Sequence, residues 1–186
     1  GGADTLTGGA DDDVIVGGVG NDTIDAGEGN NVVLGDDGEL DFAGGVLVEA
    51  LSTDITAGGD DQVTAGAGRD VVVGGAGDDS LSAGDGANVL IGDSAELTFD
   101  AGALAAAVSI TGGGGADTLT GGAGFDVIVG GDGADTIDAG GVGDEAGNVI
   151  AGDDARLVWN GADGDPSTLD LAAAIAYVPF LCDYRR

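Results

Sequence analysis

The chain has 186 residues, and 35 acidic residues against 4 basic ones give it a formal net charge of −31. This charge excludes nucleic-acid binding, which needs a basic patch, and it argues against contact with anionic membrane surfaces. Hydrophobic residues nevertheless make up 42% of the chain, so it can build a core, unlike a disordered acidic tail. Because two carboxylates about 4 Å apart repel by roughly 4 kcal/mol at an effective dielectric near 20, we expect metal ions to join the folded state.

From its first residues the chain repeats a nine-residue unit, G-G-x-G-x-D-x-U-x, in which U is a large aliphatic residue. Residues 8–16 and 17–25 are two successive copies. Glycine permits the positive φ of tight turns, and the β-branched residues after the aspartate suit a strand. Each copy therefore predicts a turn and a short strand, with two copies forming one turn of a flattened parallel coil that has a strand in each of two sheets.

Alternate residues of a strand face opposite sides, so the U side chains are predicted to point into the coil. They are Leu6, Ile15, Ile24, Val33, Val63, Val72, Leu81, Leu90, Leu119, Ile128, Ile137 and Ile150. The sequence thus predicts an all-β fold, a parallel β-roll that resembles a β-helix solenoid.

A longer period of about 57 residues contains the short one. Asp4, Asp61 and Asp117 occupy equivalent places in three blocks. We expect one continuous solenoid divided into residues 1–57, 58–113 and 114–186, the last with a short insertion near 141–144 and a cap-like C-terminal segment. The chain begins within a repeat and carries no initiator Met, so we interpret it as a piece of a longer protein.

The nonapeptide resembles the repeats-in-toxin (RTX) calcium-binding repeat of secreted bacterial proteins. The longer block resembles the repeat arrays of large secreted surface proteins and adhesins. The RTX resemblance implies a β-roll that holds several Ca²⁺ ions, an extracellular location at the bacterial cell surface, and export by a type I system.

Coils that stack at about 4.8 Å bring Asp4 opposite Asp22, and Asp13 opposite Asn31. The resemblance implies that calcium lies between such pairs, with backbone carbonyls completing a shell of oxygens. The predicted ligands at these turns are Asp4, Asp13, Asp22, Asn31, Asp61, Asp70, Asp79, Asn88, Asp117, Asp126, Asp135 and Asn148. The asparagine that ends each block either forms a weaker calcium site or only tolerates the turn geometry.

Three further aspartates, Asp36, Asp93 and Asp153, directly follow the glycine that opens the next turn. They are predicted either as additional calcium ligands or as local turn caps. The sequence favours neither interpretation.

The outward-facing strand positions differ between the two sheets. One sheet presents polar pairs such as Thr5 and Thr7, whereas the other presents apolar pairs such as Val14 and Val16. An apolar face of this extent has to be covered. Either the aliphatic interblock segments 39–56, 96–110 and 156–181 fold back over it, or a second protomer or a neighbouring domain packs on this Val-rich outer face.

Within the interblock segments we predict short strands around residues 40–42, 97–99 and 157–159, and a short helix over 168–178. No apolar run approaches the length of about 20 residues that a membrane span needs, so we expect no membrane insertion. The chain has no His and a single cysteine, Cys182.

Neither HExxH nor GxSxG occurs, so we expect no enzymatic activity. The sequence favours an extracellular structural module, rigidified by calcium, in an adhesin, surface-layer or filament protein. The alternative is the calcium-dependent C-terminal folding and secretion domain of an enzyme such as a protease or lipase.

Overall fold

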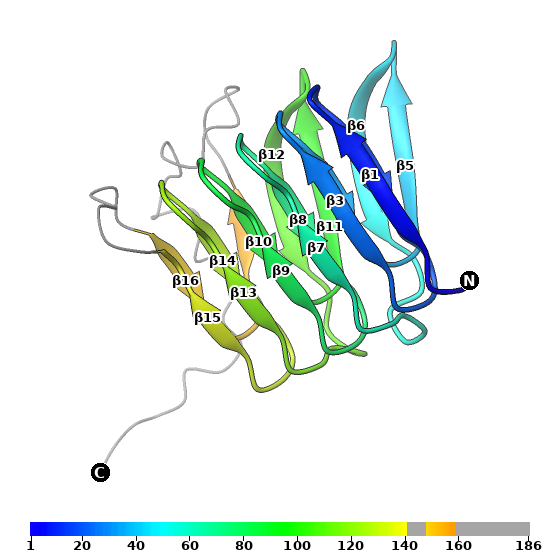
Figure 1. Cartoon of the computed structure of the whole chain (residues 1–186), viewed down its shortest axis with the longest axis vertical. Helices are drawn as coiled ribbons and strands as arrows, with labels where there is room; N and C mark the ends of the chain where they lie inside the picture. The colour runs from blue at the N-terminus through cyan, green and yellow to red at the C-terminus, as the bar shows by residue number, and fades with distance from the viewer. Residues whose placement is uncertain (141–147, 159–186) are drawn as a thin grey trace.

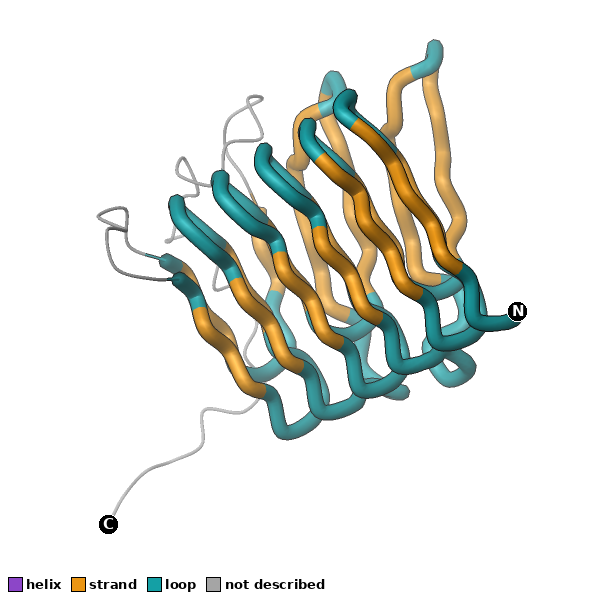
Figure 2. The backbone as a smooth tube through the Cα atoms, viewed as in Figure 1, coloured by secondary structure: helices purple, strands orange, loops and turns teal. Residues whose placement is uncertain are grey.

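The computed structural model describes residues 1–140 and 148–158, and the regular structure in this part of the chain consists of β-strands alone. The strands form three sheets (Figure 1), and the tube drawing makes the regular succession of strand and turn visible (Figure 2). Among the described residues, no helix is long and apolar enough to span a membrane. The predicted helix over 168–178 and the insertion near 141–144 lie outside the described residues.

Two parallel sheets make the roll. Sheet A has the order β1 (Thr5–Gly9), β3 (Thr23–Gly27), β7 (Gln62–Thr64), β9 (Ser80–Ser82), β13 (Thr118–Thr120) and β15 (Thr136–Asp138). Sheet B has the order β2 (Val14–Val16), β4 (Val32–Leu34), β8 (Val71–Val73), β10 (Val89–Ile91), β14 (Val127–Val129) and β16 (Val149–Ala151). The chain alternates between the sheets, which confirms the predicted coil of two nonapeptides per turn.

The register of sheet A shows how the blocks join. Thr5 lies opposite Thr23, one coil of 18 residues later, whereas Thr23 lies opposite Gln62 across the interblock segment. The stack therefore continues without a break although 20 or more residues leave it at each block boundary.

The predicted aliphatic positions fill the space between sheets A and B. Ile24, Val63, Leu81, Leu90 and Ile128 are among those fully buried there, in one cluster. Among the described residues the clear exception is Ile150 of the end strand β16, which is 54% exposed.

The interblock segments form a third, antiparallel sheet. Sheet C has the order β5 (Gly38–Ala43), β6 (Val46–Ser52), β11 (Ala95–Asp100), β12 (Ala103–Ser109) and β17 (Arg156–Val158). Its strands lie behind the roll in Figure 1. The predicted strands around residues 40–42 and 97–99 correspond to parts of β5 and β11, and Arg156–Val158 is the described part of the third.

Sheet C covers the apolar face of sheet B. Val73, Ile91 and Val129 of sheet B share a buried cluster with Leu97 and Leu104 of sheet C. Of the two interpretations that the sequence leaves open, internal cover is thus the one observed, so most of the Val-rich face lies inside the molecule. The polar positions of sheet A, including Thr5 and Thr23, remain exposed.

Candidate metal sites at the turns

The residue directly before each strand of the roll belongs to one of two rows, one along each rim. Before the strands of sheet A, this position is aspartate throughout: Asp4, Asp22, Asp61, Asp79, Asp117 and Asp135. We call this row the aspartate rim. Before the strands of sheet B, aspartate and asparagine alternate in what we call the alternating rim: Asp13, Asn31, Asp70, Asn88, Asp126 and Asn148.

Within each rim, the Oδ1 of every residue after the first accepts a hydrogen bond from the backbone N–H of the preceding rim residue. The Oδ1 of Asp22 accepts a hydrogen bond from the backbone N–H of Asp4 at 2.7 Å, and the Oδ1 of Asn31 accepts one from Asp13 at 3.0 Å. The same bond links Asp22 to Asp61, and Asp61 to Asp79, at 2.7 and 2.8 Å. The predicted pairing of turn residues in successive coils is therefore present in the structure.

The second oxygen of these carboxylates has no such bond. The Oδ2 atoms of Asp22, Asp61, Asp79, Asp117 and Asp135 are buried without a hydrogen-bond partner. In native proteins most buried polar atoms are satisfied, so a row of unpaired carboxylate oxygens points to a cation that the side chains would ligate.

The immediate surroundings of Oδ2 consist of more acceptors. A Cβ atom built on Gly17 would lie 2.7 Å from Asp22 Oδ2 and would also collide with the carbonyl oxygen of Gly35 in the next coil. The carboxylate and the carbonyl thus converge on the space left by the missing side chain of Gly17. The same three-part arrangement recurs with Gly35, Asp61 and the carbonyl of Gly74.

No group of three or more His, Cys, Asp or Glu side chains gathers into a metal-binding cluster among the described residues. An ion at the rim would therefore be held by few carboxylates, with backbone carbonyls as the remaining ligands. Such a set is made of oxygen alone and is of the kind that Ca²⁺ accepts, with 6–8 oxygen ligands in a flexible shell. The residues present fit a calcium ion.

The electrostatics of the aspartate rim are unfavourable without a cation. Burial, together with the neighbouring charges of Asp117 and Asp61, raises the pKa of Asp79 to about 9 in spite of the lowering effect of the Asp61 N–H. Burial likewise raises the pKa of Asp61 to about 7. A divalent ion would reverse these directions, because an opposite charge nearby favours the ionised carboxylate.

The asparagines of the alternating rim behave differently. The Nδ2 of Asn31 donates to the carbonyl of Ala65 at 3.3 Å, and the Nδ2 of Asn88 donates to the carbonyl of Gly84 at 3.3 Å. An amide hydrogen thus reaches the turn carbonyls, whereas the Oδ2 of an aspartate can only repel them. This contact favours the interpretation that asparagine satisfies the turn by itself over that of a weaker calcium site.

Asp36 and Asp93 lie where the chain leaves the roll for sheet C. The Oδ1 of Asp36 accepts a hydrogen bond from Gly59 at 3.2 Å, and its Oδ2 accepts one from Ala76 at 2.6 Å. The Oδ2 of Asp93 accepts the equivalent bond from the N–H of Asp132, whereas its Oδ1 is buried without a hydrogen-bond partner. These two aspartates therefore cap the turns that the interblock segments interrupt. A calcium-binding role for them stays a prediction, and the third residue of the set, Asp153, is exposed.

Sequence reasoning missed a second contact between turns at the position before the rim residue. Asp12 Oδ1 accepts a hydrogen bond from the backbone N–H of Asn30, and Asp60 Oδ1 accepts one from Asp78. The sequence feature that could have indicated this contact is the frequent occurrence of Asp and Asn at this position. These exposed side chains link coils in the same way as the rim residues, but they are open to water.

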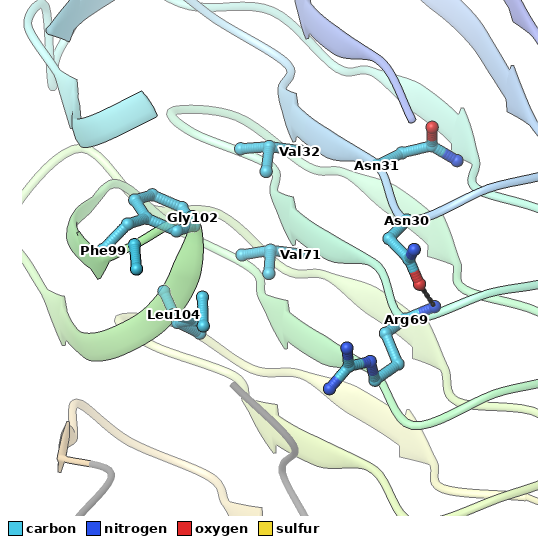
Figure 3. A pocket seen from close by; sticks show the side chains of 10 residues that line it. Asn30, Asn31, Val32, Arg69, Val71, Phe99, Gly102 and Leu104 are labelled. Carbon is cyan, nitrogen blue, oxygen red and sulfur yellow. Dashed lines mark hydrogen bonds between the residues drawn. The ribbon is translucent and has the colours of Figure 1, made fainter. Parts of the chain in front are cut away.

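A cavity of about 350 Å³ opens beside the alternating rim, between sheet B and the tip of the β11–β12 hairpin (Figure 3). Val32, Val71 and Leu104 line its apolar part, and the backbone N–H of Arg69 donates to Asn30 Oδ1 at 3.0 Å at its polar end. Its lining residues include no carboxylate, hydroxyl or thiol.

Comparison with known proteins identifies the repeat. A family model of the RTX calcium-binding nonapeptide repeat, which contains four copies, matches residues 1–38, 55–94 and 111–145. These ranges contain the whole aspartate rim and the alternating rim as far as Asp126, and they leave out nearly all of the hairpins of sheet C. No curated protein and no solved structure matches the chain.

Proposed function

Because this chain belongs to the RTX calcium-binding nonapeptide repeat family, we propose that it is a structural module of a secreted bacterial adhesin, surface-layer or filament protein, without enzymatic activity. In this proposal calcium folds the module and makes it rigid. The observation that carries the proposal is the aspartate rim, where buried carboxylate oxygens without hydrogen-bond partners face backbone carbonyls of the next coil.

In the proposed calcium sites, Asp22, Asp61, Asp79, Asp117 and Asp135 supply carboxylate oxygens along the aspartate rim. Asp13, Asp70 and Asp126 do the same along the alternating rim. The ions provide the positive charge that four arginines cannot supply to a chain of net charge −31. Folding and calcium binding are then coupled, because a ligand that binds only the folded chain stabilises it by mass action.

The connection between blocks supports the role of a rigid spacer over that of an enzyme's C-terminal domain. β6 pairs with β11 and β12 pairs with β17, so each hairpin of sheet C is hydrogen-bonded to the strand of the next block. Three sheets thus continue across the block boundaries, and bending at a boundary would break hydrogen bonds in all of them. This continuity suits a module that transmits force or sets a distance.

The coupling also suits export. At low intracellular calcium the acidic chain stays expanded, and outside the cell millimolar calcium is comparable with the affinities of about 10⁻⁴–10⁻³ M typical of extracellular sites. The module then folds after it leaves the cell.

A calcium titration followed by circular dichroism, with small-angle X-ray scattering at both end points, tests the proposal. We expect conversion of a disordered spectrum to β-structure near millimolar calcium, and a change from an expanded coil to a compact, stiff particle. Magnesium at the same concentration is the matched control, since it demands stricter geometry and gives up its water reluctantly. A chain that is fully folded in calcium-free buffer at neutral pH would contradict the proposal.

A further inference from the structure

A groove runs beside the alternating rim, between sheet B and the hairpin tips of sheet C. The cavity of about 350 Å³ shown in Figure 3 forms one part of it. A second hollow of about 410 Å³ shares Asn30, Val32, Arg69, Phe99 and Gly102 with that cavity. Val32 and Phe99 belong to β4 and β11, which have partner strands on both sides. Both volumes are within the range of about 300–1,000 Å³ that is typical of ligand sites.

The groove crosses the strands of sheet B at their first residues. Val14, Val32 and Val71 begin β2, β4 and β8, and they lie side by side in the parallel register. At a strand spacing of about 4.8 Å, this floor extends for about 10 Å along the stack. The groove is therefore elongated, and it fits an extended ligand better than a compact one.

The sheet C side of the groove contributes aromatic rings. Phe99 faces Val32 and Val71 of sheet B across the cavity (Figure 3). Phe42, the residue of β5 equivalent to Phe99, lines the second hollow. The whole chain has only four Phe, two Tyr and one Trp, so two rings along one groove concentrate its aromatic surface there. The face of such a ring offers a flat apolar contact to a ligand.

The rim side of the groove carries planar polar groups in a row. Asp12, Asn30 and Arg69 directly precede the rim residues of β2, β4 and β8. Asp12 Oδ1 accepts hydrogen bonds from the backbone N–H and the Nδ2 of Asn30, at 2.7 and 3.0 Å. Asn30 Oδ1 accepts one from the backbone N–H of Arg69 at 3.0 Å. This ladder fixes a carboxylate, an amide and a guanidinium side by side, so that donors and acceptors are available together.

The charges at the groove disfavour ionic ligands. The chain carries a net charge of −31, which repels anions, and the guanidinium of Arg69 repels cations. A neutral ligand that is rich in hydroxyl groups meets neither repulsion. Its hydroxyls can donate to Asp12 and accept from Asn30 and Arg69.

We propose that this groove binds a neutral polysaccharide in an extended conformation. The sugar rings place their C–H faces against Phe99 and the valine floor, and their hydroxyls against Asp12, Asn30 and Arg69. The site exists only when sheet C covers sheet B, because Asn30 belongs to the first block and Phe99 to the second. This binding function goes beyond the role of a spacer and does not depend on it.

The third block provides a closing substitution for the groove. Phe125 directly precedes the rim residue of β14, as Arg69 does for β8, and it packs against the buried cluster between sheets B and C. Arg69→Phe should therefore fill the polar side of the groove with a side chain that this fold accepts at the equivalent position. Arg156→Gln is the matched control, since Arg156 is an exposed residue of β17 that lines neither hollow.

NMR titration of the calcium-loaded chain tests the proposal, with the methyl signals of Val32, Val71 and Leu104 as reporters. The probes are maltohexaose, cellohexaose, mannohexaose and fully N-acetylated chitohexaose. We expect at least one of them to shift the three signals in a saturable way. Arg69→Phe should weaken that binding about tenfold or more, whereas Arg156→Gln should leave it within about twofold.

Circular dichroism in calcium checks that each variant is folded, so that a loss of binding can be assigned to the groove. Equal binding by Arg69→Phe and the unsubstituted chain would overturn the proposal, as would the absence of shifts with all the saccharides. A proline-rich peptide is the competing extended ligand, because such peptides dock in aromatic-lined grooves. Saturable shifts with the peptide alone would overturn the proposal and assign the groove to a protein partner. None of these outcomes alters the calcium titration, which measures folding.

Discussion

A carboxylate and an amide occupy equivalent places in neighbouring turns of the alternating rim, and they differ in their second side-chain atom. Asp70 carries a buried Oδ2 without a hydrogen-bond partner, whereas Asn31 and Asn88 carry an Nδ2 that donates to turn carbonyls. The Oδ1 of both residue types accepts the same bond from the preceding coil. The choice between Asp and Asn therefore decides whether a turn needs a cation, while the ladder itself stays the same.

Asn88→Asp should create a calcium-dependent turn. The substitution removes the side-chain N–H that donates to the carbonyl of Gly84, and it adds a charge at a fully buried position. We expect isothermal titration calorimetry to show at least one more calcium ion per chain and a folding transition that requires more calcium. Gln62→Glu adds the same charge at an exposed position of sheet A and should leave the number of ions unchanged. Equal stoichiometry for both variants would contradict this assignment.

Asp79→Asn should have the opposite effect on the aspartate rim. The amide oxygen can keep the hydrogen bond that Asp79 Oδ1 now accepts, at 2.8 Å, from the backbone N–H of Asp61 in the adjacent coil. Its Nδ2 would face the carbonyl of Gly92, which now lies beside Asp79 Oδ2. We expect fewer bound calcium ions and more residual β-structure in calcium-free buffer at pH 8. Folding then no longer has to bury a carboxyl group that is ionised in the unfolded chain and whose pKa rises to about 9 on burial.

Asp25→Asn is the control for Asp79→Asn. It removes the same charge from an exposed position of β3, so it reports the effect of net charge alone. Calorimetry and circular dichroism that cannot distinguish the two variants would show that the rim carboxylates are not ligands.

At the scale of elements, the hairpins of sheet C stabilise the roll by covering sheet B. Leu97 of β11 is fully buried in the cluster that joins the two sheets, while the equivalent Leu40 of β5 is only half-buried at the open end. Leu97→Ala should lower the free energy of unfolding by about 2–4 kcal/mol. Leu40→Ala should cost clearly less, as measured by chemical denaturation at saturating calcium. Equal losses would mean that β5 is covered in solution.

Much of the roll follows from local rules. The period of nine predicts where turns and strands lie, and the alternation within strands identifies Ile24 and Leu90 as core residues. The burial of the U residues can be predicted in this way because it depends on the local pattern and not on distant segments. The apolar outward positions of sheet B also predict that a cover exists. The order of sheet C does not follow in this way, because the pairing of Leu97 with Ala50 joins hairpins from different blocks and depends on how the coils stack.

The candidate sites were predictable to a similar extent. The repeat predicts which residues line the rims and which of them face each other, such as Asp4 and Asp22. It does not distinguish the two oxygens of one carboxylate, because this depends on the backbone N–H of the next coil. The capping role of Asp36 likewise became visible only when Gly59 and Ala76, far along the chain, were found at its two oxygens.

At the scale of the whole molecule, the buried carboxylates make folding depend on pH in a direction that calcium reverses. Without calcium, burial raises the pKa of Asp36, Asp70 and Asp117 to about 6 and that of Asp93 to about 7. The pKa of an aspartate in an unfolded chain is ordinarily 3.8. The folded chain therefore binds more protons than the unfolded chain between these values, and its stability falls as pH rises.

We expect calcium-free chain to show β-structure and a thermal transition at pH 5.5 that weaken progressively up to pH 9. With calcium the order should invert over the same range, because the ion competes with protons for the carboxylates and its apparent affinity rises as they ionise. Circular dichroism melts at fixed ionic strength, with and without calcium, measure both trends. Asp79→Asn separates the effect of buried groups from that of general charge repulsion. Burial raises the pKa of Asp79 from 3.8 to about 9, so its loss should flatten the calcium-free profile throughout this interval. Above pH 7, where the groups with lower pKa values have ionised, it should remove most of the remaining slope. Asp25→Asn should leave the shape of that profile unchanged, and a calcium-free melting temperature that is constant from pH 5.5 to 9 would contradict the argument.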